Sequence, residues 1–391
     1  MIRFTVATVS LEAVQANLRA VQQMLARESH GLGPSGTAEP RNGGTSEPHV
    51  PGIIAVVKAN AYGHGADRVG PALEAAGASM LACADIEEGI TLRQAGVSIP
   101  VLVFGALSIS DLAGVFDYRL TPTVSSPAAA TALDEAAVAR GVRLRCHLKI
   151  DTGMNRLGFR FDNLERTMPA VLASRPLDFE AVYTHFATAD LPESPFLEEQ
   201  RVRFDRARAT LEAIGLRRVR CHAANSAALL RDSRTWLDWV RPGLLLYGVV
   251  PPPLGASTLD LRPALSLTSR IVAVKGMRPG EGTGYGLRWT PDTPRSIAIV
   301  PAGYADGLDT RLANRASVLV RGRRMPIVGS VCMDMIMIDV TGLDVSPGDE
   351  VVIIGRQGDQ EITARQTAAA IGAIPWEVVC RLGARIERRY A

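Results

Sequence analysis

Lysine is scarce in this sequence. Only Lys58, Lys149 and Lys275 occur, so arginine supplies almost all of the 43 basic side chains. Chemistry that depends on a lysine amine therefore has three candidates. An excess of charge is also lacking, because the net charge is only +3 and no basic tract is interleaved with aromatic residues. This charge pattern argues against nucleic acid as a partner.

Paired cysteines and long apolar runs are missing as well. The cysteines are odd in number and widely spaced, at Cys83, Cys146, Cys221, Cys332 and Cys380. This pattern argues against a disulfide framework and against paired metal ligands. No segment reaches the length of a membrane span, and the N-terminus has no apolar stretch of signal-peptide length. We therefore expect a cytoplasmic protein with buried free thiols, no metal and no membrane partner.

What the sequence does contain is a regular alternation of strand-like and helix-like segments. The apolar, strand-like runs are Ile53–Val57, Met80–Ala84, Val101–Phe104, Thr121–Val124, Val142–Ile150, Phe179–Phe186, Val219–Ala223 and Trp239–Arg241. Amphipathic segments such as Ala66–Ala76 and Glu198–Ile214 lie between most of them. This alternation predicts a closed (β/α)8 barrel of the TIM type over residues 9–261. A doubly wound open sheet is the alternative, but no G-x-G-x-x-G follows the first strand.

Two further regions differ from this pattern. Residues 29–49 are rich in Gly, Pro, Ser and Thr, which predicts a flexible surface insertion without an assigned function. From residue 262 to 391, short strand-like runs are broken by Gly, Pro and Asp, which predicts an antiparallel β domain. Leu265–Val274 is expected to be its first strand, and residues 1–8 are a candidate addition to it.

The most informative stretch runs from Ile53 to Gly65. An apolar, mostly β-branched run ends there in Lys58, and the glycines that follow let backbone approach a ligand closely. A lysine at the carboxyl end of a buried strand is partly desolvated, which lowers its pKa and frees the amine for imine chemistry. On this stretch alone, a lysine that merely extends its amine to solvent is the alternative.

The carboxyl ends of the other strands carry further polar residues, and in a barrel these ends meet at one face. The loops after the last two strands are the usual phosphate site of such barrels, and they contain Ser226 and the backbone N–H groups of Gly243 and Leu244. Taken alone, each of these segments reads as a simple helix cap or turn. Together with Lys58, they point to pyridoxal 5′-phosphate as the cofactor.

The same segments resemble the motifs of a known family, the alanine racemases, which are barrel-type enzymes that depend on pyridoxal phosphate. The matching segments, in the family's order, are Val56–Gly65, Lys149–Met154, Arg156–Gly158, Tyr183–Ala187, Asn225–Ser226, Arg241–Gly243, Gly303–Gly307 and Cys332–Asp334. The resemblance covers essentially the whole chain apart from residues 29–49.

The resemblance implies two acid/base residues. Lys58 matches the lysine that holds the cofactor covalently and serves the face of the substrate Cα that corresponds to D-alanine. Racemisation needs a second group on the opposite face, because one base returning its proton to one face would not invert the centre. Tyr285 matches the tyrosine that the family supplies from the β domain of the partner subunit. Phenols ordinarily have a pKa of about 10, so a tyrosine in this role needs nearby positive charge, for which Arg156 is a candidate source.

The resemblance also implies how the cofactor ring is held. Arg241 matches the arginine that hydrogen-bonds the pyridine nitrogen, and His185 matches a residue that orients this arginine. Because a guanidinium does not give up its proton, the ring should stay unprotonated and be a weaker electron sink. A weaker sink favours racemisation over competing reactions and argues against a decarboxylase.

The remaining site residues follow from the resemblance as well. Arg156 and the backbone N–H of the partner's Met333 would bind the substrate carboxylate. Lys149 matches a lysine that is carbamylated in some members and positions that arginine. The phosphate would be held by Tyr62, Ser226, Gly243 and Leu244, and Tyr304 and Asp334 from the partner subunit would narrow the entrance.

The implied function is the interconversion of L- and D-alanine in a head-to-tail homodimer with shared active sites, which supplies D-alanine for peptidoglycan. One position departs from the pattern, because Ala384 stands where some members have a tyrosine beside the phosphate or the substrate methyl group. A broad-specificity racemase that also accepts serine therefore remains an alternative. A non-catalytic pyridoxal-phosphate-binding protein is a second alternative, but such barrel-only proteins lack the β domain that carries Tyr285.

Overall fold

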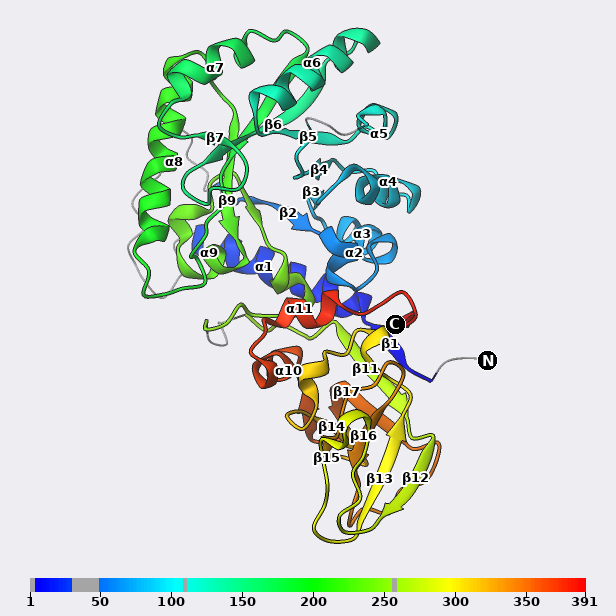
Figure 1. The fold of residues 1–391 in the computed structure, drawn as a ribbon. Helices are drawn as coiled ribbons and strands as arrows, with labels where there is room; N and C mark the ends of the chain where they lie inside the picture. Colours follow the sequence, from blue (N-terminus) through cyan, green and yellow to red (C-terminus); the bar gives the residue numbers. More distant parts are fainter. Residues whose placement is uncertain (1–3, 30–48, 108–110, 255–258) are drawn as a thin grey trace.

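The computed structural model describes residues 4–29, 49–107, 111–254 and 259–391. Apart from its two end residues, the insertion predicted at residues 29–49 lies outside the described residues. Figure 1 shows a barrel surrounded by helices and, next to it, an elongated β domain.

In the described residues, eight parallel strands close into a barrel. They are β2 (Gly52–Val56), β3 (Met80–Cys83), β4 (Val101–Val103), β5 (Thr121–Val124), β6 (Leu144–Asp151), β8 (Leu177–Tyr183), β9 (Arg220–Asn225) and β10 (Trp239–Arg241). Each strand pairs with the next, and β10 pairs back to β2. The short strand β7 (Phe159–Arg160) adds to β6 outside this ring. The predicted closed barrel is therefore confirmed, and the open sheet is wrong.

Helices cover the outside of the barrel (Figure 1). The helical segments of the barrel region are α1 (Leu11–Ser29), α2 (Lys58–Tyr62), α3 (Ala66–Ala75), α4 (Ile86–Gln94), α5 (Ala113–Asp117), α6 (Pro127–Arg140), α7 (Leu164–Leu172), α8 (Phe196–Ala213) and α9 (Ser226–Arg231). Local sequence sets several of their ends, since Asp85 caps α4 and Ser126 caps α6 through side-chain oxygens. The strands β3, β4 and β5 are buried at every position, as expected when helices cover a parallel sheet.

The β domain is a single sheet in the order β12-β13-β16-β15-β14-β17-β11-β1-β19, with β18 added to β17. Its strands are β1 (Val6–Val9), β11 (Leu265–Arg270), β12 (Ala273–Met277), β13 (Arg295–Val300), β14 (Ser317–Val320), β15 (Arg323–Val328), β16 (Ile336–Asp339), β17 (Glu350–Gln357), β18 (Gln360–Ile362) and β19 (Glu387–Tyr390). The helices α10 (Ala364–Ile371) and α11 (Pro375–Cys380) follow β18. The pairs are antiparallel except β1 with β19, so the predicted antiparallel domain is confirmed in the main.

The prediction that Leu265–Val274 forms one strand is wrong. The chain changes partner at Ile271 and Val272, because the Ile271 amide bonds the Asp349 carbonyl and the Val272 amide bonds the Ile299 carbonyl. The first part, β11, pairs with β17, whereas the second part, β12, pairs with β13. Short 3₁₀ turns complete the fold, namely η1 (Ser233–Thr235), η2 (Leu244–Tyr247), η3 (Tyr285–Leu287), η4 (Tyr304–Asp306) and η5 (Thr310–Leu312).

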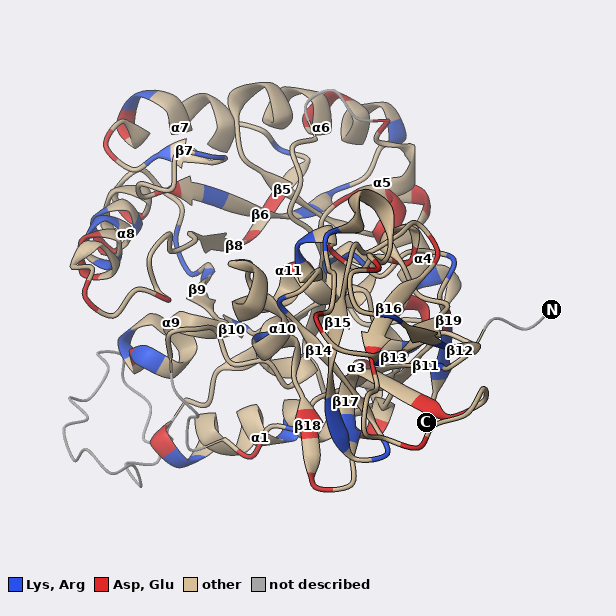
Figure 2. Ribbon diagram, turned by 60° about the horizontal axis from the view of Figure 1, so that its bottom comes forward, with Lys and Arg blue, Asp and Glu red and all other residues tan. Residues whose placement is uncertain are grey.

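Charged side chains of both signs are intermixed on the outer helices, as Figure 2 shows for α7 and α8. On α8, Arg201 forms ion pairs with Glu198 and Asp205, and Arg203 pairs with Glu199 one turn away. Such pairs stabilise a helix by only about 0.2–0.5 kcal/mol each, and they balance its surface charge. None of the described helices is both long enough and apolar enough to cross a membrane.

Candidate active site at the carboxyl ends of the barrel strands

Lys58, the lysine predicted from the sequence to be functional, begins a left-handed helical turn. Lys58 is the first residue of α2, two residues beyond the end of β2. The next four residues, Ala59 to Tyr62, all have φ between 52° and 54°. L-residues in this left-handed conformation are strained by about 1–2 kcal/mol each, and such strain gathers at functional sites. The sequence contained no signal for this turn, because none of the four residues is a glycine.

The turn persists because neighbouring segments hold it from several sides. The Asn60 side chain accepts a hydrogen bond from the Ala66 amide at 2.8 Å. Gly63 lies so close to α11 that an added Cβ would stand 2.2 Å from the Val379 carbonyl oxygen. Arg388 of β19 donates from Nε to the Gly63 carbonyl oxygen at 2.7 Å. The β domain of the same chain therefore braces the segment that carries the candidate lysine.

Basic side chains gather at this end of the barrel. Burial lowers the pKa of Lys58, and the positive charge of Arg156 lowers it further. Burial also lowers the pKa of Lys149 to about 8, with added effects from Arg156 and Arg241. Close cations favour neutral amines and attract an anionic ligand. The site thus suits an amine nucleophile next to a phosphate or a carboxylate.

Arg241 is buried, with 3% of its surface exposed. Its Nη1 donates to His222 Nδ1 at 2.7 Å, and its Nη2 donates to the carbonyl oxygens of Thr184 at 2.7 Å and Ala223 at 2.8 Å. His185 Nδ1 lies 3.2 Å from Nη2. Burial lowers the pKa of Arg241 to about 10, so the guanidinium stays charged at neutral pH.

The guanidinium of Arg241 has donors to spare. Among the residues that the structure describes, one partner contacts Nη1 and the other three contact Nη2. The Nε–H and one Nη1–H therefore have no protein acceptor there. A ligand atom with a lone pair can accept from such donors. An unprotonated ring nitrogen is an acceptor of this kind, so the residues present fit a pyridine ring at this position.

A second part of the site is a small cup formed by the starts of α9 and η2. The Gly243 amide donates to Ser226 Oγ at 2.9 Å, which leaves the Ser226 hydroxyl hydrogen available to a ligand. The helix cap of α9 is Asn225, whose side chain accepts from the Ala228 amide. Ser226 is therefore not needed as the cap. A Cβ at Gly243 would stand 2.7 Å from Tyr62 Oη, so a side chain there would have to displace this phenol.

Tyr62 was expected here, but its neighbours were not. Its ring centroid lies 5.1 Å from that of Tyr247, which in turn lies 4.5 Å from His64. The buried Tyr247 hydroxyl donates to the Val56 carbonyl oxygen at 3.0 Å, at the end of β2. The apolar spacing around Tyr247 resembles that of a core position, so sequence offered no signal for its place beneath the cup.

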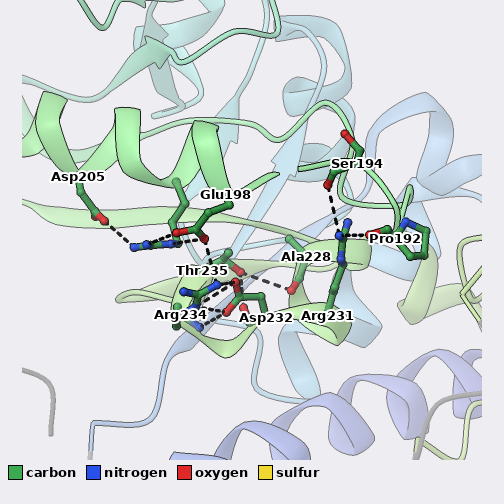
Figure 3. Close-up of polar contacts among 10 residues, drawn as sticks. Pro192, Ser194, Glu198, Asp205, Ala228, Arg231, Asp232, Arg234 and Thr235 are labelled. Carbon is green, nitrogen blue, oxygen red and sulfur yellow. Dashed lines mark hydrogen bonds and ion pairs between the residues drawn. The ribbon is translucent and has the colours of Figure 1, made fainter. Parts of the chain in front are cut away.

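Arg231, at the end of α9, fixes the position of this helix (Figure 3). Its guanidinium donates to carbonyl oxygens of the loop before α8, including those of Leu191 at 2.8 Å and Pro192 at 2.6 Å. Charge-assisted hydrogen bonds of this kind are stronger than neutral ones. The start of α9, which carries Ser226, is therefore held by contacts at its other end.

The predicted residues of the β domain form a separate group. The Tyr304 amide bonds the Cys332 carbonyl, next to Met333 and Asp334, and Ser330 Oγ donates to the Tyr285 carbonyl oxygen at 2.6 Å. The side chain of Tyr285 is 78% exposed, and that of Met333 is 51% exposed. In Figure 1 the segment between β12 and β13 lies at the end of the β domain away from the barrel. One chain thus does not bring Tyr285 beside Lys58.

Models of two protein domains match nearly all of the described chain. One, described as "Alanine racemase, N-terminal domain", matches residues 45–251, and the other, "Alanine racemase, C-terminal domain", matches residues 264–390. Two relatives are an alanine racemase of Symbiobacterium thermophilum, 40% identical over 99% of this chain and 97% of that protein, and one of Carboxydothermus hydrogenoformans, 39% identical over 98% of each.

Solved structures agree with these matches. The alanine racemase of Streptomyces lavendulae has a TM-score of 0.89 and 33% identity, covering 100% of this chain and 98% of that one. The alanine racemase of Bacillus anthracis with bound L-Ala-P has a TM-score of 0.86 and 33% identity, covering 100% and 96% of the two chains.

Proposed function

Because the chain belongs to the alanine racemase family and is an amino-acid racemase, we propose that it interconverts L- and D-alanine with pyridoxal 5′-phosphate at the carboxyl ends of the barrel strands. The observation that supports this most is the placing of three features at one end of a closed barrel. These are the amine of Lys58, the spare N–H groups of Arg241, and the cup of Ser226 and Gly243.

We assign each part of the cofactor to residues whose chemistry suits it. Lys58 would hold it covalently, and Arg241 would donate to its ring nitrogen while His185 keeps the guanidinium in place. The hydroxyls of Tyr62 and Ser226, with the backbone N–H of Leu244, would bind the phosphate, whereas the Gly243 N–H predicted for this role donates to Ser226 Oγ and would orient that hydroxyl instead. When bound, pyridoxal phosphate supplies an electron-withdrawing ring that makes the Cα proton of an attached amino acid more acidic.

Two residues, one from each subunit, would move the proton. Lys58, whose pKa is lowered by burial and by Arg156, would take or return it on the D-alanine face. Tyr285 of the partner subunit would do the same on the opposite face. The exposure of Tyr285 at 78% in a single chain suits a residue that completes a neighbour's site.

The substrate carboxylate would lie against Arg156 and the backbone N–H of Met333 from the partner subunit. Tyr304 and Asp334 would line the entrance from the same side. The protein would therefore act as a head-to-tail homodimer, because each barrel lacks its second base without the other subunit. The exposed Met333 and Tyr304 side chains, at 51% and 45%, support this arrangement.

We place this enzyme in the cytoplasm, where its product would supply D-alanine for peptidoglycan. All five cysteines are free, and three of them are buried, as expected in a reducing compartment. Ala384 is exposed in the loop after α11. No observation in the described residues favours serine over alanine as the substrate.

The experiment that tests this proposal follows the Cα–H signal of L-alanine in heavy water. Loss of that signal together with the appearance of D-alanine is the expected result, whereas binding without exchange would rule out racemisation. A Tyr285→Phe variant should keep the absorption of the lysine-bound cofactor and lose most of the racemisation. Full activity in that variant would show that the two-base assignment is wrong.

A further inference from the structure

A row of hydrogen-bonded side chains crosses the barrel interior from Arg241 to the opposite end. Arg241 Nη1 lies 2.7 Å from His222 Nδ1, and His222 Nε2 lies 3.0 Å from His147 Nδ1. His147 Nε2 in turn lies 3.1 Å from Glu180 Oε1. Both histidine side chains are fully buried, whereas the side chain of Glu180 is 23% exposed. The row therefore ends at solvent, on the side of the barrel away from the candidate active site.

The chemistry of the groups allows only one direction of donation. A guanidinium can only donate, so His222 Nδ1 must be the acceptor and His222 Nε2 must carry the hydrogen. That hydrogen requires His147 Nδ1 to accept, which places the hydrogen of His147 on Nε2. The Glu180 carboxylate accepts this last hydrogen. Burial, with the charge of Arg241 for His222, lowers the pKa of both histidines, so both rings are neutral.

The two rings are held in these orientations by aromatic neighbours. The ring of Tyr183 stacks on His222 with centroids 4.6 Å apart and planes 10° from parallel. The ring of Trp239 stacks on His147 at 5.8 Å and 12°. A half-turn of either ring must pass through an orientation that breaks its stack, so a change of tautomer is the easier response to a lost partner.

Glu180 lies in a cleft of about 400 Å³ at the amino-terminal end of the strands, with Arg145 and Arg220 beside it. The hydrogen bond from His147 lowers the pKa of this carboxyl, and the two arginines lower it further. Glu180 is thus a charged acceptor at neutral pH. Asp178, two residues earlier on β8, faces Arg143 instead and takes no part in the row.

We propose that Glu180 is a positioning residue for Arg241, because its carboxylate accepts the last hydrogen of the row and so stabilises the tautomers of His147 and His222 that keep an acceptor facing the guanidinium. This inference rests on the proposed function, in which Arg241 donates to the cofactor's ring nitrogen. Without an acceptor at position 180, the Nε2–H of His147 would lose its partner. The opposite tautomers, in which His222 presents a hydrogen to Arg241, would then become more populated and would weaken the hold on the guanidinium.

The test begins with the tautomers themselves. In the full-length protein labelled with 15N-histidine and measured without added cofactor, NMR should show the hydrogen on Nε2 of both His147 and His222. Any other tautomer pair in the unsubstituted protein overturns the proposal. Glu180→Leu should lose this pair of signals, whereas Glu180→Gln should keep it, because the amide oxygen still accepts. Asp178→Leu, on the same strand, is the matched control and should leave the signals unchanged.

The second readout is the dissociation constant of pyridoxal phosphate, with racemisation measured alongside. Glu180→Leu should bind the cofactor about tenfold more weakly, the effect of one lost hydrogen bond, and Glu180→Gln should restore most of the affinity. Unchanged tautomers and unchanged affinity in Glu180→Leu would overturn the proposal. If the protein bound no cofactor at all, the proposed function would fail while the tautomer result still decided the role of Glu180 within the row.

Discussion

Gly243 provides a test of the cup because its constraint is steric rather than conformational. Its φ of −117° is open to any residue. A Cβ added there would nevertheless stand 2.7 Å from Tyr62 Oη, 3.2 Å from Cζ and 3.4 Å from Cε2. Contacts below 3.0 Å require a shift, and the Tyr62 side chain is packed against the buried Tyr247. We therefore expect Gly243→Ala to disturb Tyr62 rather than the backbone.

The size of the effect follows from the overlap. Inserting one methyl group into a packed site destabilises a protein by about 1–3 kcal/mol. If Tyr62 stays in place, this loss appears in the free energy of unfolding. If Tyr62 swings away, the loss appears in cofactor binding, where about 1–3 kcal/mol corresponds to roughly 5- to 150-fold weaker affinity. The two losses together should reach at least about 1 kcal/mol.

The assay combines urea unfolding with titration of the apoprotein by pyridoxal phosphate. Gly276→Ala is the matched control, since a Cβ at Gly276 meets nothing within 4 Å, and it should change neither quantity. A Tyr62→Phe, Gly243→Ala double variant removes the closest atom and should recover part of the lost stability through coupling between the two sites. The steric reasoning is refuted if Gly243→Ala alone leaves both stability and affinity at their original values.

Three other substitutions test further features. Ala59→Val should destabilise the protein by about 1–3 kcal/mol because a β-branched residue strongly disfavours φ of 53°. Ala128→Val, on the exposed face of α6, is the control and should lower the free energy of unfolding by less than about 1 kcal/mol. Equal losses in urea unfolding would contradict this reasoning. Burial lowers the pKa of His64 to about 4. Below pH 6.5 the folded state therefore binds fewer protons than the unfolded state. The free energy of unfolding should fall as the pH falls from 6.5 towards 4, by up to about 1.4 kcal/mol per pH unit. His64→Asn should reduce that slope by one proton, and an unchanged slope would remove His64 as its source. Lys149, with a pKa lowered to about 8 and two arginines close by, should form a carbamate in 13C-bicarbonate, seen by NMR and lost in Lys149→Arg; a signal that survives in this variant would exclude Lys149 as its source.

Strands with clear boundaries in the sequence could be predicted well. Thr121–Val124 and Trp239–Arg241 agree with β5 and β10 at both ends. Both runs are short and end directly before residues that favour turns or caps, Ser125 to Pro127 and Pro242 to Gly243. The position of Lys58 at the barrel mouth followed from the same logic, since the carboxyl ends of parallel strands meet at one face.

Other features could not be predicted because they depend on distant contacts. The left-handed turn at Ala59–Tyr62 has no local signal and is held by Val379 and Arg388 of the β domain. The place of Glu180 at the end of the histidine row depends on which strands are neighbours, β8 with β6 and β9. Periodicity identifies Glu180 only as an acidic residue on a strand.

The pairing of β1 has a consequence for how the protein is made. Val6–Val9 is synthesised before the barrel, yet its partners β11 and β19 lie after the barrel in the chain. During synthesis this apolar strand must wait, with both edges unpaired, while the whole barrel emerges. Unpaired apolar edges are the sites at which nascent chains aggregate. Slow translation or a chaperone shortage should therefore reduce the yield of folded protein through β1.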